Sequence, residues 1–125
     1  MVKTLIKIHL DGSHLVFEPV CRGVSTRRDF CLSLNDWKQL NMKEGRVTAR
    51  NINNFADFQV ISALDLIRID FFWLNNIEGD VRGRQETVFL TFSQVRSWVW
   101  AGAKGTYRQI SVNPCTPNQI ILIDK

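Results

Sequence analysis

The chain has 125 residues, of which 45% are hydrophobic and 22% are charged, a balance typical of one globular domain. Its net charge of +4 is compatible with a polyanionic partner but is too small to require one. No apolar run approaches the roughly 20 residues of a membrane helix, and the first ten residues alternate in polarity, unlike a signal peptide. We therefore expect one compact domain over residues 1–125, cytoplasmic or nuclear, with no membrane partner.

Seven segments predict strands, either by alternating apolar and polar residues or by enrichment in β-forming residues. In chain order they are residues 2–10, 14–20, 28–34, 64–74, 87–92, 107–112 and 119–123. Asp11-Gly12-Ser13 joins the first two as a β-hairpin. The polar, glycine-bearing residues 75–83 and the proline-containing residues 113–118 predict loops.

Two short helices are expected, each directly after a strand. Asn35 offers an N-cap for the first helix, and Ser93 offers one for the second. Gly102 ends the second helix, since glycine adopts the left-handed conformation common at helix ends. The first helix ends near Met42 or continues toward Phe55, and Ile52, Phe55 and Phe58 are either its last buried positions or part of a loop packed on the sheet.

The two strand-to-helix junctions look alike in sequence. Residues 30–40 (FCLSLNDWKQL) align with residues 88–98 (VFLTFSQVRSW), each giving an alternating strand, a small polar residue and apolar residues at the same spacing. The expected fold class is therefore α+β, with curved antiparallel sheets and two short helices. Two interpretations stay open: strand-strand-strand-helix repeats over residues 1–62 and 63–125 that pack as a pseudo-dimer, or junctions that are similar because such transitions generally are.

The second half carries a longer pattern. An apolar strand holds Asp70 and Trp73, an acidic turn with a glycine follows at residues 78–80, and the basic stretch Arg82-Gly83-Arg84 precedes a closing strand. These features, in this order, resemble the core of the transcriptional positive cofactor four family of single-stranded-DNA-binding coactivators. The resemblance implies subunits of strands plus one helix that dimerise so that curved sheets present a nucleic-acid channel.

Binding an unpaired strand requires cations that follow the phosphates and flat rings on which bases stack. Alternate residues of a strand point to the same face about 7 Å apart, so a sheet can supply both. The residues predicted to bind nucleic acid are Arg22, Arg27, Arg28, Arg68, Phe72, Trp73, Arg82 and Arg84. The alternative for the two aromatic residues of this set is burial in the core.

Other chemistry finds little support. The three cysteines are widely spaced, and neither His9 nor His14 lies at a zinc-like spacing from them. Phosphate-loop, serine-nucleophile and zinc-protease motifs are absent. We therefore expect no metal, no cofactor and no enzymatic activity. The predicted partner is single-stranded DNA or RNA, with a homodimer as a further expectation. The alternative function is a protein-interaction module, such as a phage or mobile-element inhibitor or an assembly subunit.

Overall fold

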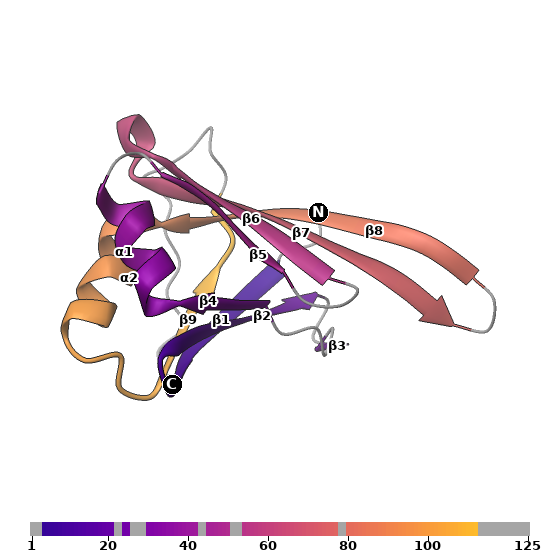
Figure 1. Ribbon diagram of the computed structural model, residues 1–125, viewed down its shortest axis with the longest axis horizontal. Helices are drawn as coiled ribbons and strands as arrows, with labels where there is room; N and C mark the ends of the chain where they lie inside the picture. Colours follow the sequence, from indigo (N-terminus) through magenta and orange to yellow (C-terminus); the bar gives the residue numbers. More distant parts are fainter. Residues whose placement is uncertain are drawn as a thin grey trace.

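The computed structural model describes residues 4–21, 24–25, 30–42, 45–50, 54–77 and 80–112. Within these residues the chain forms strands, two α-helices and one short 3-10 helix (Figure 1). In chain order the elements are β1 (Thr4–Asp11), β2 (His14–Cys21), β3 (Val24–Ser25), β4 (Phe30–Ser33), α1 (Leu34–Met42), β5 (Arg46–Arg50), β6 (Asn54–Ile61), η1 (Ser62–Leu64), β7 (Leu66–Ile77), β8 (Asp80–Thr91), α2 (Phe92–Trp100) and β9 (Thr106–Ile110). The expected α+β class is confirmed.

The strands form two antiparallel sheets. In the first sheet β9 pairs with β1 and β1 with β2, while β3 and β4 pair with different parts of the remaining side of β2. The second sheet has the order β5-β6-β7-β8. Figure 1 shows α1 and α2 side by side at one end of the two sheets, and the Trp37 and Phe92 rings, one from each helix, lie 6.1 Å apart.

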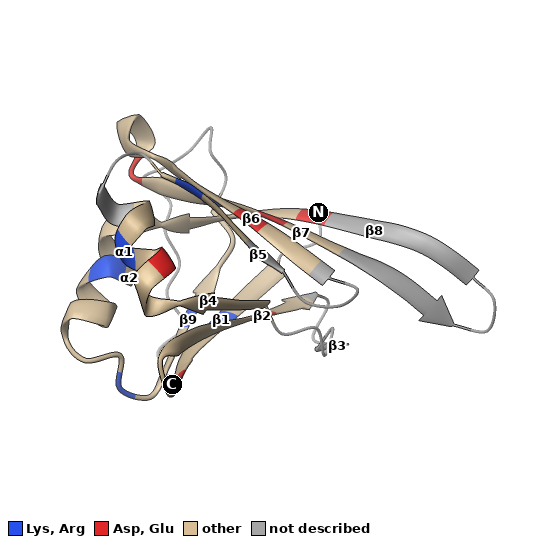
Figure 2. Ribbon diagram, viewed as in Figure 1, with Lys and Arg blue, Asp and Glu red and all other residues tan. Residues whose placement is uncertain are grey.

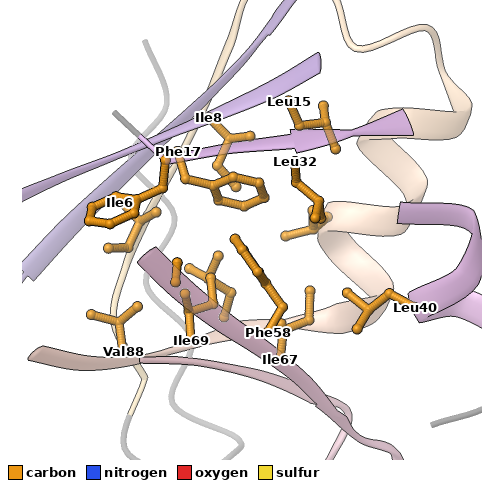
Figure 3. Packing of buried hydrophobic residues seen from close by; sticks show 14 of the residues in the cluster. Ile6, Ile8, Leu15, Phe17, Leu32, Leu40, Phe58, Ile67, Ile69 and Val88 are labelled. Atoms are coloured by element: carbon orange, nitrogen blue, oxygen red, sulfur yellow. The ribbon is translucent and has the colours of Figure 1, made fainter. Parts of the chain in front are cut away.

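The core lies between the two sheets and is built mainly from alternate residues of the strands. Ile6 and Ile8 on β1 are fully buried, as are Ile67 and Ile69 on β7, because side chains two apart on a strand point to the same face. Figure 3 shows these residues converging from both sheets. Aromatic rings connect the sheets: Phe17 lies 4.9 Å from Phe58, and Phe30 lies 4.5 Å from Phe71, measured between ring centroids.

The two sheets have equivalent topology. Apart from the two-residue strand β3, each sheet has three successive strands that lead into a nine-residue helix. These strands are β1, β2 and β4 in the first sheet, and β6, β7 and β8 in the second. The outermost strand of each sheet then comes from the segment after the other helix, since β5 follows α1 and pairs with β6, and β9 follows α2 and pairs with β1.

Local details repeat as well. The helices begin at Leu34 and Phe92, the register that the alignment of the two junctions predicts. The backbone N–H of Leu34 donates to the carbonyl of Ser13, and that of Phe92 donates to the carbonyl of Asp65, each at 2.9 Å. The structural units do not coincide with residues 1–62 and 63–125, because β5 and β6 belong to the second sheet. That the units arose by duplication and form a pseudo-dimer stays a prediction.

Two interpretations of the middle of the chain were wrong. The first helix ends at Met42, one of the two expected ends, and residues 46–50 and 54–61 are neither helix nor packed loop but the strands β5 and β6. The buried positions are Ala56, Phe58 and Val60, which have a period of two, whereas the helical interpretation relied on residues spaced by three. Residues 75–77 and 80–83 are not a loop, because β7 and β8 continue their ladder until Ile77 pairs with Asp80. The predicted strand at residues 119–123 and the loop before it lie outside the described residues.

The helix caps also differ from expectation, because each strand runs directly into its helix. The N-cap of α1 is Ser33 rather than Asn35, and its hydroxyl oxygen accepts the N–H of Asp36 at 3.0 Å. Ser93 lies inside α2 and is held by Asp65, whose carboxylate accepts its backbone N–H at 3.0 Å and its hydroxyl at 2.5 Å. Thr91 occupies the N-cap position of α2, and the capping hydrogen bonds come from Asp65 in the turn between η1 and β7.

A buried polar network joins the edge of the first sheet to the edge of the second. Gln109 on β9 is fully buried, and its Nε2 donates to the Thr91 hydroxyl on β8 at 3.1 Å. The Tyr107 hydroxyl donates to Oε1 of Gln109 at 2.9 Å. Beyond this network the N–H of Val112 donates to the carbonyl of Phe89 at 2.9 Å. The chain after α2 therefore links both sheets at this side.

This network makes a testable prediction for Tyr107, the single tyrosine of the chain. Burial raises the pKa of its hydroxyl to about 12. Phenolate absorbance should therefore rise with a midpoint near pH 12, rather than near the usual value of about 10. In the unfolded chain the group ionises at the lower pH, so the free energy of unfolding should fall between about pH 10 and 12.

The control is Tyr107→Phe, which should lose the part of this pH dependence that comes from the phenol. A folded-state midpoint close to the usual value would contradict burial of the hydroxyl at the junction of β8 and β9.

Candidate nucleic-acid interface

The outer face of the second sheet carries three neighbouring rows of side chains, one basic, one acidic and one aromatic. In the basic row, Arg46 and Arg68 both lie opposite Gln59 in the ladder. With strands about 4.8 Å apart, the two arginine positions are separated by about 10 Å across the sheet. Arg46 is exposed and Arg68 is partly exposed, with 66% and 44% of their side chains accessible.

The aromatic row consists of Phe55 and Phe72, which lie directly opposite each other on β6 and β7. Their rings are stacked, with centroids 4.4 Å apart and planes inclined by 15°. Both side chains are half-buried, unlike Phe58 and Phe71, which face the core and are fully buried. The pair thus presents partly accessible ring surface on the outer face.

The acidic row separates the other two rows. Asp57 and Asp70 lie directly opposite each other, and each accepts a hydrogen bond of 2.5 Å from the hydroxyl of a threonine on the neighbouring strand, Thr48 and Thr87 respectively. Asp70 also pairs with Arg68, whose Nε lies 3.2 Å from its Oδ2. Figure 2 shows residues of both charge signs on this sheet, so the described part of the face is mixed in charge rather than uniformly basic.

Three predicted residues lie further along the same hairpin. Trp73 pairs with Arg84, and Asn75 pairs with Arg82. These pairs lie at and beyond the first residue of β6, Asn54, which is opposite Trp73. From the sequence, Trp73 was expected close to the end of a strand. It lies inside β7 instead, because the ladder continues to Ile77. The structure describes the backbone of these three predicted residues and not their side chains.

The predicted set is therefore divided. Arg68 and Phe72 share the outer face, whereas the backbone position of Trp73 alternates with that of Phe72 and belongs to the other face of the strand. Arg22, Arg27 and Arg28 lie outside the described residues. The structure thus brings together five of the eight candidates on one hairpin, two of them on a face where their side chains are described.

Sequence reasoning missed Arg46 and Phe55, which complete the basic and aromatic rows. The signal was present, because Phe55, Asp57 and Gln59 alternate with the buried positions of β6. It was hidden by the helical interpretation of this segment. Sequence reasoning also missed Trp100, the last residue of α2, which is 75% exposed.

Comparison with known proteins gives no assignment: no family model, no curated protein and no solved structure matches the chain. Within the residues that the structure describes, no helix has the length and apolar character needed to cross a membrane.

The aromatic row makes a prediction about stability. Because the Phe55 and Phe72 rings are stacked, the two alanine substitutions should not be additive. A double-mutant cycle in urea should give a coupling energy of about 0.5–1.5 kcal/mol. The matched control pairs Phe55→Ala with Gln94→Ala, a half-buried residue on α2, and should be additive within about 0.5 kcal/mol. Full additivity of the first pair would contradict the stacked geometry.

Proposed function

We propose that the protein binds single-stranded nucleic acid without sequence preference, on the outer face of the second sheet and along the β7–β8 hairpin. The observation that carries the proposal is the stacked Phe55–Phe72 pair on a face that also holds Arg46 and Arg68. Rings of this kind stack on any base, because every base has a π-face. Such a surface favours unpaired strands, whose bases are free to stack.

The cations are suitably placed for a strand that crosses the sheet. Arg46 and Arg68 are about 10 Å apart, and Arg68 lies four residues from Phe72, or about 13 Å along β7. Guanidinium groups hold phosphate oxygens in a planar fork, which a lysine ammonium does not reproduce. A base on the aromatic row and phosphates on the basic row are therefore compatible with one extended strand.

The acidic row tunes this interface and opposes tight binding. Asp70 neutralises part of the Arg68 charge, and Asp57 lies 4.0 Å from Arg46. A phosphate must compete with these carboxylates for the guanidinium groups. We therefore expect moderate affinity that depends on the arginines of the hairpin, Arg82 and Arg84, as much as on the described face.

A second candidate is a protein-interaction module. It is favoured by Trp100, one of two large apolar side chains that are exposed among the described residues, the other being Leu64. Apolar docking would depend weakly on salt, whereas phosphate contacts weaken steeply as salt is added.

Fluorescence anisotropy with a labelled single strand and the matching duplex tests the proposal. The single strand should bind more tightly, and about four phosphate contacts should give a log–log salt slope near −3. Phe72→Ala should weaken binding by roughly tenfold, since each stacked base contributes about 1–3 kcal/mol. Trp100→Ala removes an aromatic ring elsewhere and should leave affinity unchanged. Absence of binding at low salt would overturn the function, and equal loss in both variants would overturn the site.

The acidic row gives a prediction of opposite sign. Asp70→Asn keeps the shape of the side chain but removes the charge that pairs with Arg68. Affinity for the single strand should rise roughly fivefold at low salt, because a unit charge about 4 Å away contributes about 1 kcal/mol in water. The control Asp11→Asn changes the same charge at the exposed end of β1 and should have little effect. Unchanged or weaker binding by Asp70→Asn, measured by anisotropy, would contradict a role for Arg68.

A further inference from the structure

A pocket of about 330 Å³ lies between the two helices, away from the proposed nucleic-acid interface. The pocket is lined by residues of β1, α1, α2 and the turn after α2: Leu10, Leu34, Trp37, Lys38, Val99, Trp100, Gly102 and Ala103. Its volume is at the lower end of the range for small-molecule sites, and its walls are mostly apolar. A ligand that fills it needs a compact apolar body.

The walls are held in place by local structure. The N–H of Ala103 donates to the carbonyl of Trp98, and that of Gly102 donates to the carbonyl of Val99, each at 3.0 Å. This pair of bonds, with Gly102 at φ +98°, is the Schellman arrangement that ends a helix in a fixed turn. Nε1 of Trp98 also donates to the carbonyl of Lys104 at 3.2 Å. The pocket is therefore preformed on the α2 side.

One lining residue has a hydrogen-bond donor without an acceptor. Trp37 is 2% exposed, and its Nε1–H has no partner among the described residues. An unpaired buried donor costs about 1–3 kcal/mol, so most buried donors find an acceptor. Because the Nε1 atom has almost no accessible surface, a ligand in the pocket would contact the apolar part of the Trp37 ring rather than this donor.

The charged residue that lines the pocket is basic. Lys38 lines it from an exposed position, and the Arg96 guanidinium lies 5.3 Å from the centroid of the Trp100 ring, over its face. Figure 2 shows basic residues on both helices and on the loop after α2. The acidic residue of α1, Asp36, follows Leu34 by two positions, which is about 200° around a helix, so it lies away from the pocket.

From these two features, apolar walls and a cation at the rim, we propose that the pocket binds a small apolar monocarboxylate. Its hydrophobic body lies between Trp37, Val99 and Trp100, and its carboxylate faces Lys38. The Trp100 ring, which is 75% exposed, becomes covered. The site is separate from the nucleic-acid interface and does not rest on it.

The test uses 3-phenylpropionate as the probe and the indole N–H signals of the full chain in a two-dimensional ¹H–¹⁵N spectrum. The chain has four tryptophans and so four such signals. The acid should shift the signals of Trp37 and Trp100 and leave that of Trp73 in place. Absence of any shift at millimolar probe, or equal shifts of all four signals, would overturn the proposal.

Charge recognition is tested with the neutral amide of the same probe. The amide should bind roughly three- to fivefold more weakly than the acid, the ratio expected for one exposed ion pair. Lys38→Met keeps the apolar stem and should remove this preference without changing affinity for the amide. The control Lys104→Met should retain the preference. Equal affinity of acid and amide for the unmodified protein would overturn the carboxylate assignment, as would a preference that survives Lys38→Met.

Discussion

The contact between the inner faces of the two sheets is the interaction on which the rest of this structure depends. Each sheet alone would leave a complete apolar face in water, and burial of one phenylalanine side chain contributes about 1.5–3 kcal/mol. Phe17 against Phe58 and Phe30 against Phe71 bring large rings from opposite sheets into contact. Because this packing consumes the inner faces, polar and aromatic side chains available for partners remain on the outer faces and at the ends.

The path of the chain makes the two sheets interdependent. After each helix the chain crosses to the edge of the other sheet, so β5 completes the second sheet and β9 completes the first. The pairing of β9 with β1 joins residues about a hundred positions apart, as in Ile8 with Tyr107. Such non-local pairing has a large entropic cost of loop closure. This cost is offset only when the core forms, which favours cooperative folding. The buried Gln109–Thr91 hydrogen bond then holds the crossing segment against the second sheet.

The sequence was informative where local pattern and tertiary role agree. The first hairpin, both strand-to-helix junctions and the glycine that ends α2 follow from alternation, turn residues and caps. Prediction failed at residues 46–50 and 54–61, because phenylalanines three apart imitate a helix while Ala56, a small residue with little signal, occupies a core position of a strand. It failed again at residues 75–77 and 80–83, where asparagine and glycine suggest a loop but cross-strand pairing extends the ladder. The helix caps were misplaced because Asp65, distant in sequence from Ser93, supplies the carboxylate.

The candidate interface shows the same limit in another form. The sequence indicated which types of residue could bind nucleic acid. The face of the sheet on which each lies depends on strand register, because a shift of one position moves a side chain to the opposite face. Arg68 and Phe72 share the outer face only because β7 places Ile69 and Phe71 in the core. Arg46 and Phe55 join them through cross-strand pairings, and the alternation along β6 that places Phe55 on this face was hidden by the helical interpretation.

The two ends of the molecule differ in how much support the backbone receives. Beyond the pair Asn54–Trp73, the described part of the β7–β8 ladder continues without β6, and a two-stranded ladder is marginal alone. Within the described residues, the strand positions of Arg82 and Arg84 are therefore supported by one neighbouring strand, β7. The helix pocket, in contrast, is built on the fixed turn that ends α2. Because the two surfaces share no residue, their binding free energies should be additive.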